Sequence, residues 1–325
     1  MTREEYERRA RRRRKKRIKR LQRRLVFLCL FIVVGVIGIS VLTKAITANT
    51  KSDAKASSSK TTASEKTTTK EVSGKITADN QDAADEKAAD DNTEPVTDTR
   101  SDFAVTPGVA VGSDSQTEEK VVYLTFDDGP SVNTQAVLDI LDRYQAKATF
   151  FVTGINPDYA NMIKVAYDKG NTIGLHTMTH HYEILYASTD AYFSDLDQIG
   201  QVVKQQIGYV PAFIRFPGGS SNTVSANYTS GIMSALAPEV LNRGYQYYDW
   251  NASCGDGSND VTVESLIATA IGCQDNNIVL LLHDATGKEK TVQALPQIIE
   301  HYQGLGYTFK ALDRASYDAH HGINN

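Results

Sequence analysis

Residues 125–130 read Thr-Phe-Asp-Asp-Gly-Pro and place two adjacent carboxylates at the end of a short apolar run. Residues 121–124, Val-Val-Tyr-Leu, are typical of a buried strand, which the Gly-Pro pair stops. Two like charges buried side by side are costly unless a cation or a proton compensates them. The pair therefore suits a site where a metal binds one carboxylate and leaves the other available as a base. A solvated turn is the alternative, because Asp-Gly-Pro is also common in turns.

A second motif, His-Thr-Met-Thr-His at residues 176–180, follows another apolar run. Two histidines four residues apart lie on one face of a helical turn, so both imidazoles can reach one ion. Together with Asp128 they form a three-ligand set with an open position, the pattern of a catalytic zinc site. A structural zinc would favour four closed ligands, often cysteines. His181 is an alternative ligand beside this pair.

Residues 215–219 read Arg-Phe-Pro-Gly-Gly and end a third apolar run. Arginine is a rigid bidentate partner for a carboxylate, so Arg215 could orient Asp127 and hold it ionised. The glycine turn exposes backbone N–H groups that can stabilise an oxyanion. A surface arginine on an ordinary loop is the alternative.

Two further apolar runs end in residues whose side chains could take part in a reaction or in binding. The only tryptophan, Trp250, lies among polar residues and is either a sugar-stacking platform or a core residue. Residues 278–282, Ile-Val-Leu-Leu-Leu, end in His283 and Asp284. A histidine titrates near the working pH, so His283 suits a general acid better than a satisfied core position.

The elements that position these motifs alternate along the chain from residue 121 onward. All five motifs follow apolar runs at their carboxyl ends, where parallel α/β folds place their chemistry. Alternating strands and helices predict a parallel sheet covered by helices, here a compact and irregular α/β barrel of about seven strands. We predict strands at residues 121–126, 148–153, 172–176, 212–216, 246–251, 278–283 and 308–312, and helices at 134–144, 192–207, 263–272 and 291–304.

The N-terminal part of the 325-residue chain has a different composition. Residues 1–24 carry a net charge of +11, and residues 25–43 contain no charged side chain. As a helix the second segment would span about 28 Å, enough to cross a bilayer, and the preceding charges place the N-terminus in the cytoplasm. We interpret it as a signal anchor, with a cleaved signal peptide as the alternative.

Residues 44–118 are rich in Thr, Ser, Ala, Lys, Asp and Glu, and Phe103 is their only aromatic residue. So little apolar surface predicts a disordered extracellular stem, with a reach of roughly 50 Å, ahead of a catalytic domain at residues 119–325. Cys254 and Cys273 lie in that domain; their predicted places near opposite ends of the barrel favour free thiols, and the question of pairing stays open.

The order Thr-Phe-Asp-Asp-Gly-Pro, His-Thr-x-x-His, Arg-x-Pro, Asp-Trp and Leu-x-Leu-His-Asp resembles carbohydrate esterase family 4, the NodB-type polysaccharide deacetylases. The resemblance covers residues 119–314. It implies a distorted (β/α) barrel and a divalent metal held by Asp128, His176 and His180. Zinc is the expected metal, and Co²⁺, Mn²⁺ or Ni²⁺ are alternatives.

The same resemblance implies that Asp127 is the base, that Arg215 orients it, and that His283 is the acid. Leu281 would line the acetyl pocket. The anchor and stem look like those of peptidoglycan N-acetylglucosamine deacetylases, in which the domain lies outside the cell at the wall.

Two departures from the family pattern concern the shape of the substrate more than the reaction. The family often has Tyr after Arg-x-Pro, whereas this chain has Gly218; the Gly218 N–H can still face the oxyanion, but an aromatic groove wall is lost. The family segment Asp-x-x-Asp-Trp aligns with residues 253–257, where Asp256 remains to tune His283 while the first Asp and the Trp are missing.

The predicted activity is metal-dependent hydrolysis of N-acetyl groups on a cell-wall polysaccharide, with N-acetylglucosamine of peptidoglycan as the first choice. Alternatives are an O-acetyl esterase on xylan or a wall polymer, and a chitin-oligomer deacetylase. A glycan-binding module is the non-enzyme alternative, which the complete acid–base set argues against. Nucleic-acid binding through residues 1–24 is disfavoured because the apolar run accounts for those charges. We expect a monomeric catalytic domain.

Overall fold

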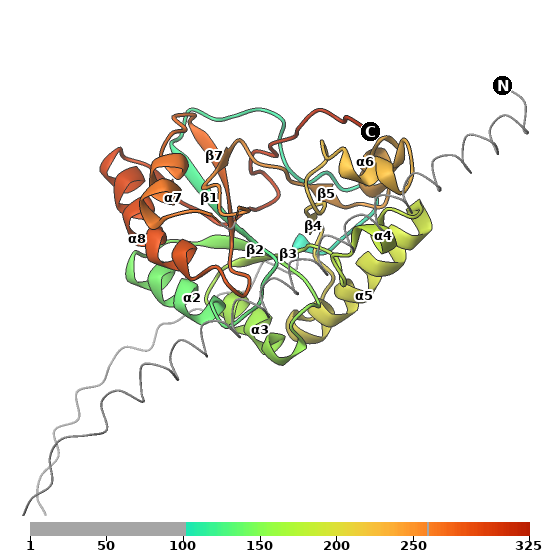
Figure 1. Cartoon of the computed structure of the whole chain (residues 1–325), viewed down its shortest axis with the longest axis horizontal. Helices are drawn as coiled ribbons and strands as arrows, with labels where there is room; N and C mark the ends of the chain where they lie inside the picture. The colour runs from blue at the N-terminus through green and yellow to red at the C-terminus, as the bar shows by residue number, and fades with distance from the viewer. Residues whose placement is uncertain (1–101, 259) are drawn as a thin grey trace, which may run out of the picture. The chain divides into compact units, whose positions relative to one another are not determined.

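A curled parallel β-sheet organises the part of the chain that the computed structural model describes, residues 102–258 and 260–325 (Figure 1). Its main path runs β5-β4-β3-β2-β1-β7-β6, and β8 pairs with the start of β1. All of these pairings are parallel, so the predicted α/β sheet is confirmed. The strands are β1 (Val121–Asp127), β2 (Ala148–Val152), β3 (Thr172–Leu175), β4 (Phe213–Ile214), β5 (Gln246–Tyr247), β6 (Ala252–Ser253), β7 (Asn277–His283) and β8 (Thr308–Phe309).

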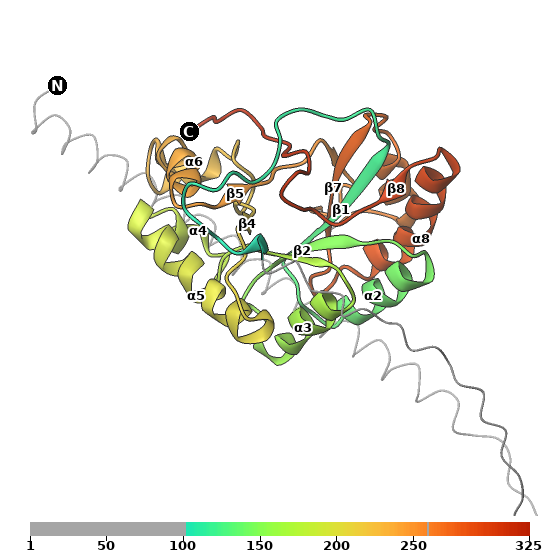
Figure 2. The ribbon, with the colours of Figure 1, turned by 180° about the vertical axis from the view of Figure 1, so that it is seen from behind.

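Helices cover the outer side of the sheet, as Figures 1 and 2 show from opposite directions. The four predicted helices are present, and three further helices, α3, α4 and α6, were not predicted. Helix α6 is interrupted in sequence by Pro238, and α3 and α4 are too short to give a clear apolar period. The helices are α2 (Thr134–Arg143), α3 (Asn161–Asp168), α4 (Tyr182–Leu185), α5 (Thr189–Ile207), α6 (Ile232–Asn242), α7 (Val263–Ala270) and α8 (Glu289–Gly304), with 3₁₀ turns η2 (Pro157–Tyr159) and η3 (Val224–Asn227).

The predicted strand at 308–312 is shortened to Thr308–Phe309. The predicted strands at 212–216 and 246–251 are also much shorter than expected. Single backbone bonds continue the pairing beyond the regular ladder, from Arg215 N–H to the Leu175 carbonyl and from Tyr248 N–H to the Ile214 carbonyl. Pro217 then turns the chain away. Strands β4 and β5 therefore end close to Arg215 and Trp250, the site residues that follow them in sequence.

Both faces of the sheet are buried. Alternate residues of β1 point in opposite directions, and Val122 and Leu124 belong to the cluster under the helices while Val121 and Tyr123 belong to a second cluster on the concave face. Burial on both sides explains why the central strands are continuous apolar runs.

Residues 102–118 differ from the sequence interpretation, which assigned them to the stem. The Phe103 ring packs edge-on against Phe213 at 5.2 Å between centroids, and Val111 is buried in the concave cluster. Ala104 bridges to Pro211, next to the start of β4, and Ser113 bridges to Tyr317. The few apolar residues of this segment thus find a surface on the domain, which begins earlier than residue 119.

The predicted basic tail, the predicted anchor at residues 25–43 and the stem up to residue 101 lie outside the described residues. Within residues 102–258 and 260–325, no helix is both long and apolar enough to span a bilayer. In the same part of the chain Cys254 and Cys273 are free thiols, and Cys254 is buried.

Candidate metal and acid–base site

The carboxyl ends of the strands bring the predicted motifs together. Asp127 ends β1 and His283 ends β7, and these two residues are paired in register on neighbouring strands. His176 directly follows β3, Arg215 follows β4, and Trp250 lies shortly after β5. Because the carboxyl ends of parallel strands share one edge of a sheet, the five segments meet there.

Asp128, His176 and His180 form a candidate metal site. Their ligand atoms all lie within 4.8 Å of one another. The Asp128 Oδ1 atom is 3.5 Å from His176 Nε2 and 3.3 Å from His180 Nε2, and it is buried without a hydrogen-bond partner. His176 Nδ1 lies 2.7 Å from the Arg215 carbonyl oxygen and must carry a proton to bond it.

That hydrogen bond decides what the ligand set can hold. With the proton of neutral His176 on Nδ1, the Nε2 lone pair faces the Asp128 carboxylate oxygen. Burial lowers the pKa of His176 to about 3, against the opposing charge of Asp128, so the ring is neutral at ordinary pH. A lone pair and an unpaired carboxylate oxygen repel each other unless a cation lies between them. The residues therefore fit a divalent metal.

The histidines do not lie on a helical turn, so that part of the prediction is wrong. Residues 176–181 form an irregular loop in which Thr177 and His180 have φ angles of 73° and 55°. Asp128 has a φ of 67°. Such left-handed backbone costs energy in residues other than glycine and is concentrated at functional sites. His181 is exposed and lies outside the ligand set.

Asp195 of α5 holds this loop in place, a role that was not predicted from the sequence. Its Oδ1 accepts hydrogen bonds from the Met178 N–H at 2.5 Å and the Thr179 N–H at 3.2 Å, and its Oδ2 accepts one from the Thr179 hydroxyl at 2.7 Å. The available signal was a carboxylate on the apolar stripe of the helix, between Tyr192 and Leu196.

Arg215 is fully buried and contacts the predicted base. Its Nη1 donates to Asp127 Oδ1 at 2.8 Å and to the Thr125 hydroxyl at 2.7 Å. Its remaining donors reach the carbonyls of Tyr248 and Asp249, each at 2.8 Å. Burial raises the pKa of Asp127, and the nearby Arg215 charge partly opposes this rise. A carboxylate whose pKa is raised in this way is a stronger base and accepts a proton more readily.

Trp250 lies beside the arginine and is half-buried. The guanidinium carbon is 4.4 Å from the Phe151 ring centroid and 5.7 Å from the Trp250 ring centroid. A Cβ on Gly219 would approach the Trp250 ring to 3.0 Å, so glycine is needed for this close packing. The structure thus places Trp250 against the buried ion pair and leaves part of its ring accessible.

His283 and Asp256 form the second acid–base pair. His283 Nδ1 lies 2.8 Å from Asp256 Oδ1, and the His283 N–H donates to Asp256 Oδ2 at 2.9 Å. Burial lowers the pKa of His283, but the hydrogen bond and charge of Asp256, with the charges of Asp127 and Asp128, raise it to about 9. Leu281 is buried two residues earlier on the same face of β7.

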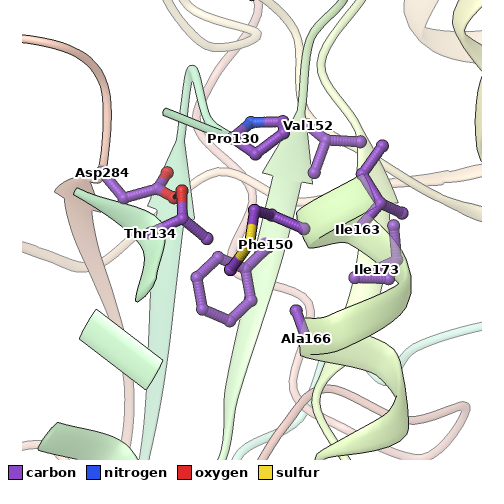
Figure 3. Close-up of a pocket in the computed structure, with 9 residues that line it drawn as sticks. Pro130, Thr134, Phe150, Val152, Ile163, Ala166, Ile173 and Asp284 are labelled. Carbon is purple, nitrogen blue, oxygen red and sulfur yellow. Dashed lines mark hydrogen bonds between the residues drawn. The ribbon is translucent and has the colours of Figure 1, made fainter. Parts of the chain in front are cut away.

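Asp284 supports the turn that carries the acid pair, a contact that the sequence did not predict. A Cβ on Gly129 would lie 2.1 Å from Asp284 Oδ1, so only glycine fits there. The Thr134 hydroxyl donates to Asp284 Oδ2 at 2.5 Å, and Figure 3 shows both side chains beside Pro130. Burial raises the pKa of Asp284 to about 7.

Gly218 is exposed and has a φ of 79°. Its N–H donates no hydrogen bond within the described residues, and the following Gly219 N–H bonds the Phe216 carbonyl. The predicted oxyanion donor is therefore available to a ligand.

A curled parallel sheet whose strand ends hold an Asp-His-His set beside an Asp–Arg pair and a carboxylate-bound histidine has the site of a hydrolase. Residues 114–232 match the model of the family described as polysaccharide deacetylase. The chain belongs to the polysaccharide deacetylases of carbohydrate esterase family 4, hydrolases that act on carbon–nitrogen bonds other than peptide bonds.

Similar proteins come from several bacteria. The crystal structure of the catalytic domain of a peptidoglycan N-acetylglucosamine deacetylase from Eubacterium rectale is 44% identical with a TM-score of 0.64, covering 66% of this chain and 99% of that one. A peptidoglycan-N-acetylglucosamine deacetylase from Bacillus cereus is 30% identical, covering 62% of this chain and 72% of that protein. A bifunctional xylanase/deacetylase from Pseudobutyrivibrio xylanivorans is 34% identical over 63% of this chain, which spans only 33% of that longer protein.

Proposed function

We propose that this chain removes N-acetyl groups from N-acetylglucosamine units of peptidoglycan and releases acetate. The main support for this reaction is that Asp127 and His283, a base and an acid, are paired in register on neighbouring strands beside the candidate ligand set. The choice of substrate is supported by the similarity to the peptidoglycan N-acetylglucosamine deacetylases named above.

Asp128, His176 and His180 are the residues that would hold a divalent metal, with zinc as the first choice. When bound there, the metal would supply Lewis-acid activation of the acetyl carbonyl and of water. The arrangement keeps the second carboxylate of the acid pair free for proton transfer, because Arg215 rather than the ligand set occupies Asp127 Oδ1.

In the proposed mechanism Asp127 accepts the proton of the attacking water through Oδ2, while Arg215 fixes its orientation. The Gly218 N–H donates to the oxyanion that develops on the acetyl oxygen. His283 is protonated at neutral pH and delivers its Nε2 proton to the leaving nitrogen, while Asp256 holds Nδ1. Leu281, on the same strand face as His283, lines the pocket for the acetyl methyl group.

The surroundings of the site suit a polymeric glycan. Exposed apolar side chains follow four of the strands at the edge where the site lies, and such side chains can stack on sugar rings. They are Val132 after β1, Ile155 and Tyr159 after β2, Ile184 after β3, and Val224 and Tyr228 after β4, of which the two tyrosines have the aromatic faces that stack.

The proposal extends to the architecture and location of the chain. We interpret the sheet as the family's distorted (β/α) barrel, with irregular segments in place of pairing between β5 and β6. Residues 25–43 anchor the chain in the membrane with the N-terminus in the cytoplasm, and the remaining stem presents a monomeric catalytic domain to the wall. These points rest on the sequence.

The test is acetate release by the purified full-length protein from peptidoglycan, chitin oligomers and acetylxylan. We expect release from peptidoglycan that a chelator lowers by at least about 100-fold and that added zinc restores, because a metal supplies several kcal/mol of charge stabilisation. A His180→Gln variant should bind metal weakly, and the exposed neighbour variant His181→Gln should behave as the wild type.

Release from acetylxylan alone would replace the proposed substrate by an O-acetyl ester, the alternative that the similarity to the xylanase/deacetylase favours. Glycan binding without release from any polymer, in a folded and metal-loaded protein, would favour the binding module.

Replacing Asp256 by Asn is expected to move the alkaline limb of the activity profile to lower pH. His283 acts in its protonated form, so activity is present below its pKa and is lost as the pH rises through it. Asp256 stabilises the charged ring, and removing that charge-assisted hydrogen bond should lower the pKa of His283 by about one to two units. The measurement is kcat/KM from pH 5 to 11, with the exposed variant Asp260→Asn as control. An unchanged alkaline limb would mean that Asp256 does not raise the pKa of the group that acts as the acid.

A further inference from the structure

Tyr182 begins α4, two residues after the ligand His180, and the mechanism above does not use it. Its ring centroid is 5.8 Å from that of His180 and 5.3 Å from that of Tyr186. The Tyr186 hydroxyl is satisfied, since it donates to the Pro217 carbonyl at 2.7 Å. The Tyr182 hydroxyl makes no hydrogen bond within the described residues and is not among their buried unpaired oxygens. The protein therefore leaves this donor open at the rim of the ligand set.

Gly218 provides the space for that hydroxyl. A Cβ on Gly218 would lie 2.4 Å from the Tyr182 hydroxyl oxygen, 3.4 Å from its Cζ atom and 3.2 Å from the Asn222 Cβ. Any residue with a side chain would displace the phenol. The free Gly218 N–H and the free Tyr182 hydroxyl thus lie side by side on one wall of the site.

The wall that they form combines an aromatic ring with hydrogen-bond donors. Tyr228 is 43% exposed, and the hydroxyl of the next residue, Thr229, ties this part of the chain to the end of α4 through the Ala187 carbonyl at 2.8 Å. Sugars offer C–H faces that stack on aromatic rings and oxygens that accept hydrogen bonds. The wall therefore fits a sugar rather than an apolar ligand.

We propose that Tyr182 is a substrate-binding residue. Its ring forms the wall of the sugar site next to His180, and its hydroxyl donates a hydrogen bond to an oxygen of the N-acetyl sugar whose acetyl group lies at the ligand set. The identity of the sugar rests on the proposed function, whereas the open phenol and its glycine neighbour do not.

The first test is Tyr182→Phe in the full-length protein, which removes the hydroxyl and keeps the ring. We expect KM for N-acetylated substrate to rise about three- to tenfold, the effect of losing one hydrogen bond, with kcat within twofold of the wild type and unchanged metal content. The control is Tyr144→Phe, which removes a hydroxyl bonded to Glu300 between α2 and α8. An unchanged KM, or a loss confined to kcat, would overturn the proposal.

The second test uses the contact between Tyr182 and Gly218. Gly218→Ala should weaken binding because its methyl group displaces the phenol, and adding Tyr182→Phe to it should then cost little more. A double-mutant cycle on KM measures this coupling. If the double variant raised KM by the product of the two single-variant increases, the two residues would not be coupled, and the contact on which the proposal depends would be overturned.

Binding separates this inference from the proposed function. The dissociation constant of chitotetraose is measured in the Asp127→Asn background, with and without Tyr182→Phe. If the wild type releases no acetate, the proposed function fails, yet a three- to tenfold weaker binding in the Tyr182→Phe protein would still support the sugar contact. Equal binding, or no binding by either protein, would overturn it.

Discussion

Replacing Asp127 by Asn is expected to lower turnover by a factor of about 10²–10⁴ without loss of metal, the range that a general base contributes. Asn keeps an oxygen that can accept the Arg215 hydrogen bond, but it cannot take a proton from water. Turnover, bound metal and thermal stability would be measured on the same preparation. Stability should fall somewhat, since Arg215 is fully buried and loses its counter-charge.

A matched variant, Asp158→Asn, changes an exposed carboxylate in η2 after the neighbouring strand and should leave turnover unchanged. If Asp127→Asn retained near-normal turnover while folded and metal-loaded, the base would have to be another group. Loss of metal together with turnover would instead assign Asp127 to the ligand set, where its Oδ2 lies 3.7 Å from His176 Nε2.

The central strands and the residues at their ends could be predicted because their signals are local. Strands β1 and β7 are continuous apolar runs that end in charged residues, and a parallel sheet gathers such ends at one edge. The register of β1 and β7 then places Asp127 and His283 opposite each other on neighbouring strands. Hence the sequence could indicate which side chains meet without giving their distances.

Other features depend on tertiary contacts and have weak local signals. Residues 102–118 hold their apolar side chains in one short stretch, 103–111, and Phe103 and Val111 pack in the cluster on the concave face, which forms only in the folded domain. The loop 176–181 reads as a helical turn by spacing alone, but Asp195 and the left-handed residues impose another path. Tyr182 becomes notable only through its approach to Gly218, which is distant in sequence.

Replacing His283 by Ala is expected to lower N-deacetylation by about 10²–10⁴-fold and to affect an activated ester much less. An amine leaves poorly unless it is protonated, whereas a nitrophenolate leaves as a stable anion and needs no acid. The measurement compares kcat/KM for an N-acetylated glycan and for a nitrophenyl acetate in both proteins. We expect the ester rate to fall less than about tenfold, because base, ligand set and Gly218 are retained.

His181→Ala provides the control for this experiment. It removes an exposed imidazole that is next to the ligand His180 in sequence but is not part of the ligand set. It should leave both rates unchanged. Equal losses on the glycan and the ester in His283→Ala would mean that this histidine stabilises charge common to both reactions. Because His283 Nε2 lies 3.9 Å from Asp128 Oδ2, metal content must be compared as well. A selective loss on the amide with full metal content would identify His283 as the proton donor to the leaving nitrogen.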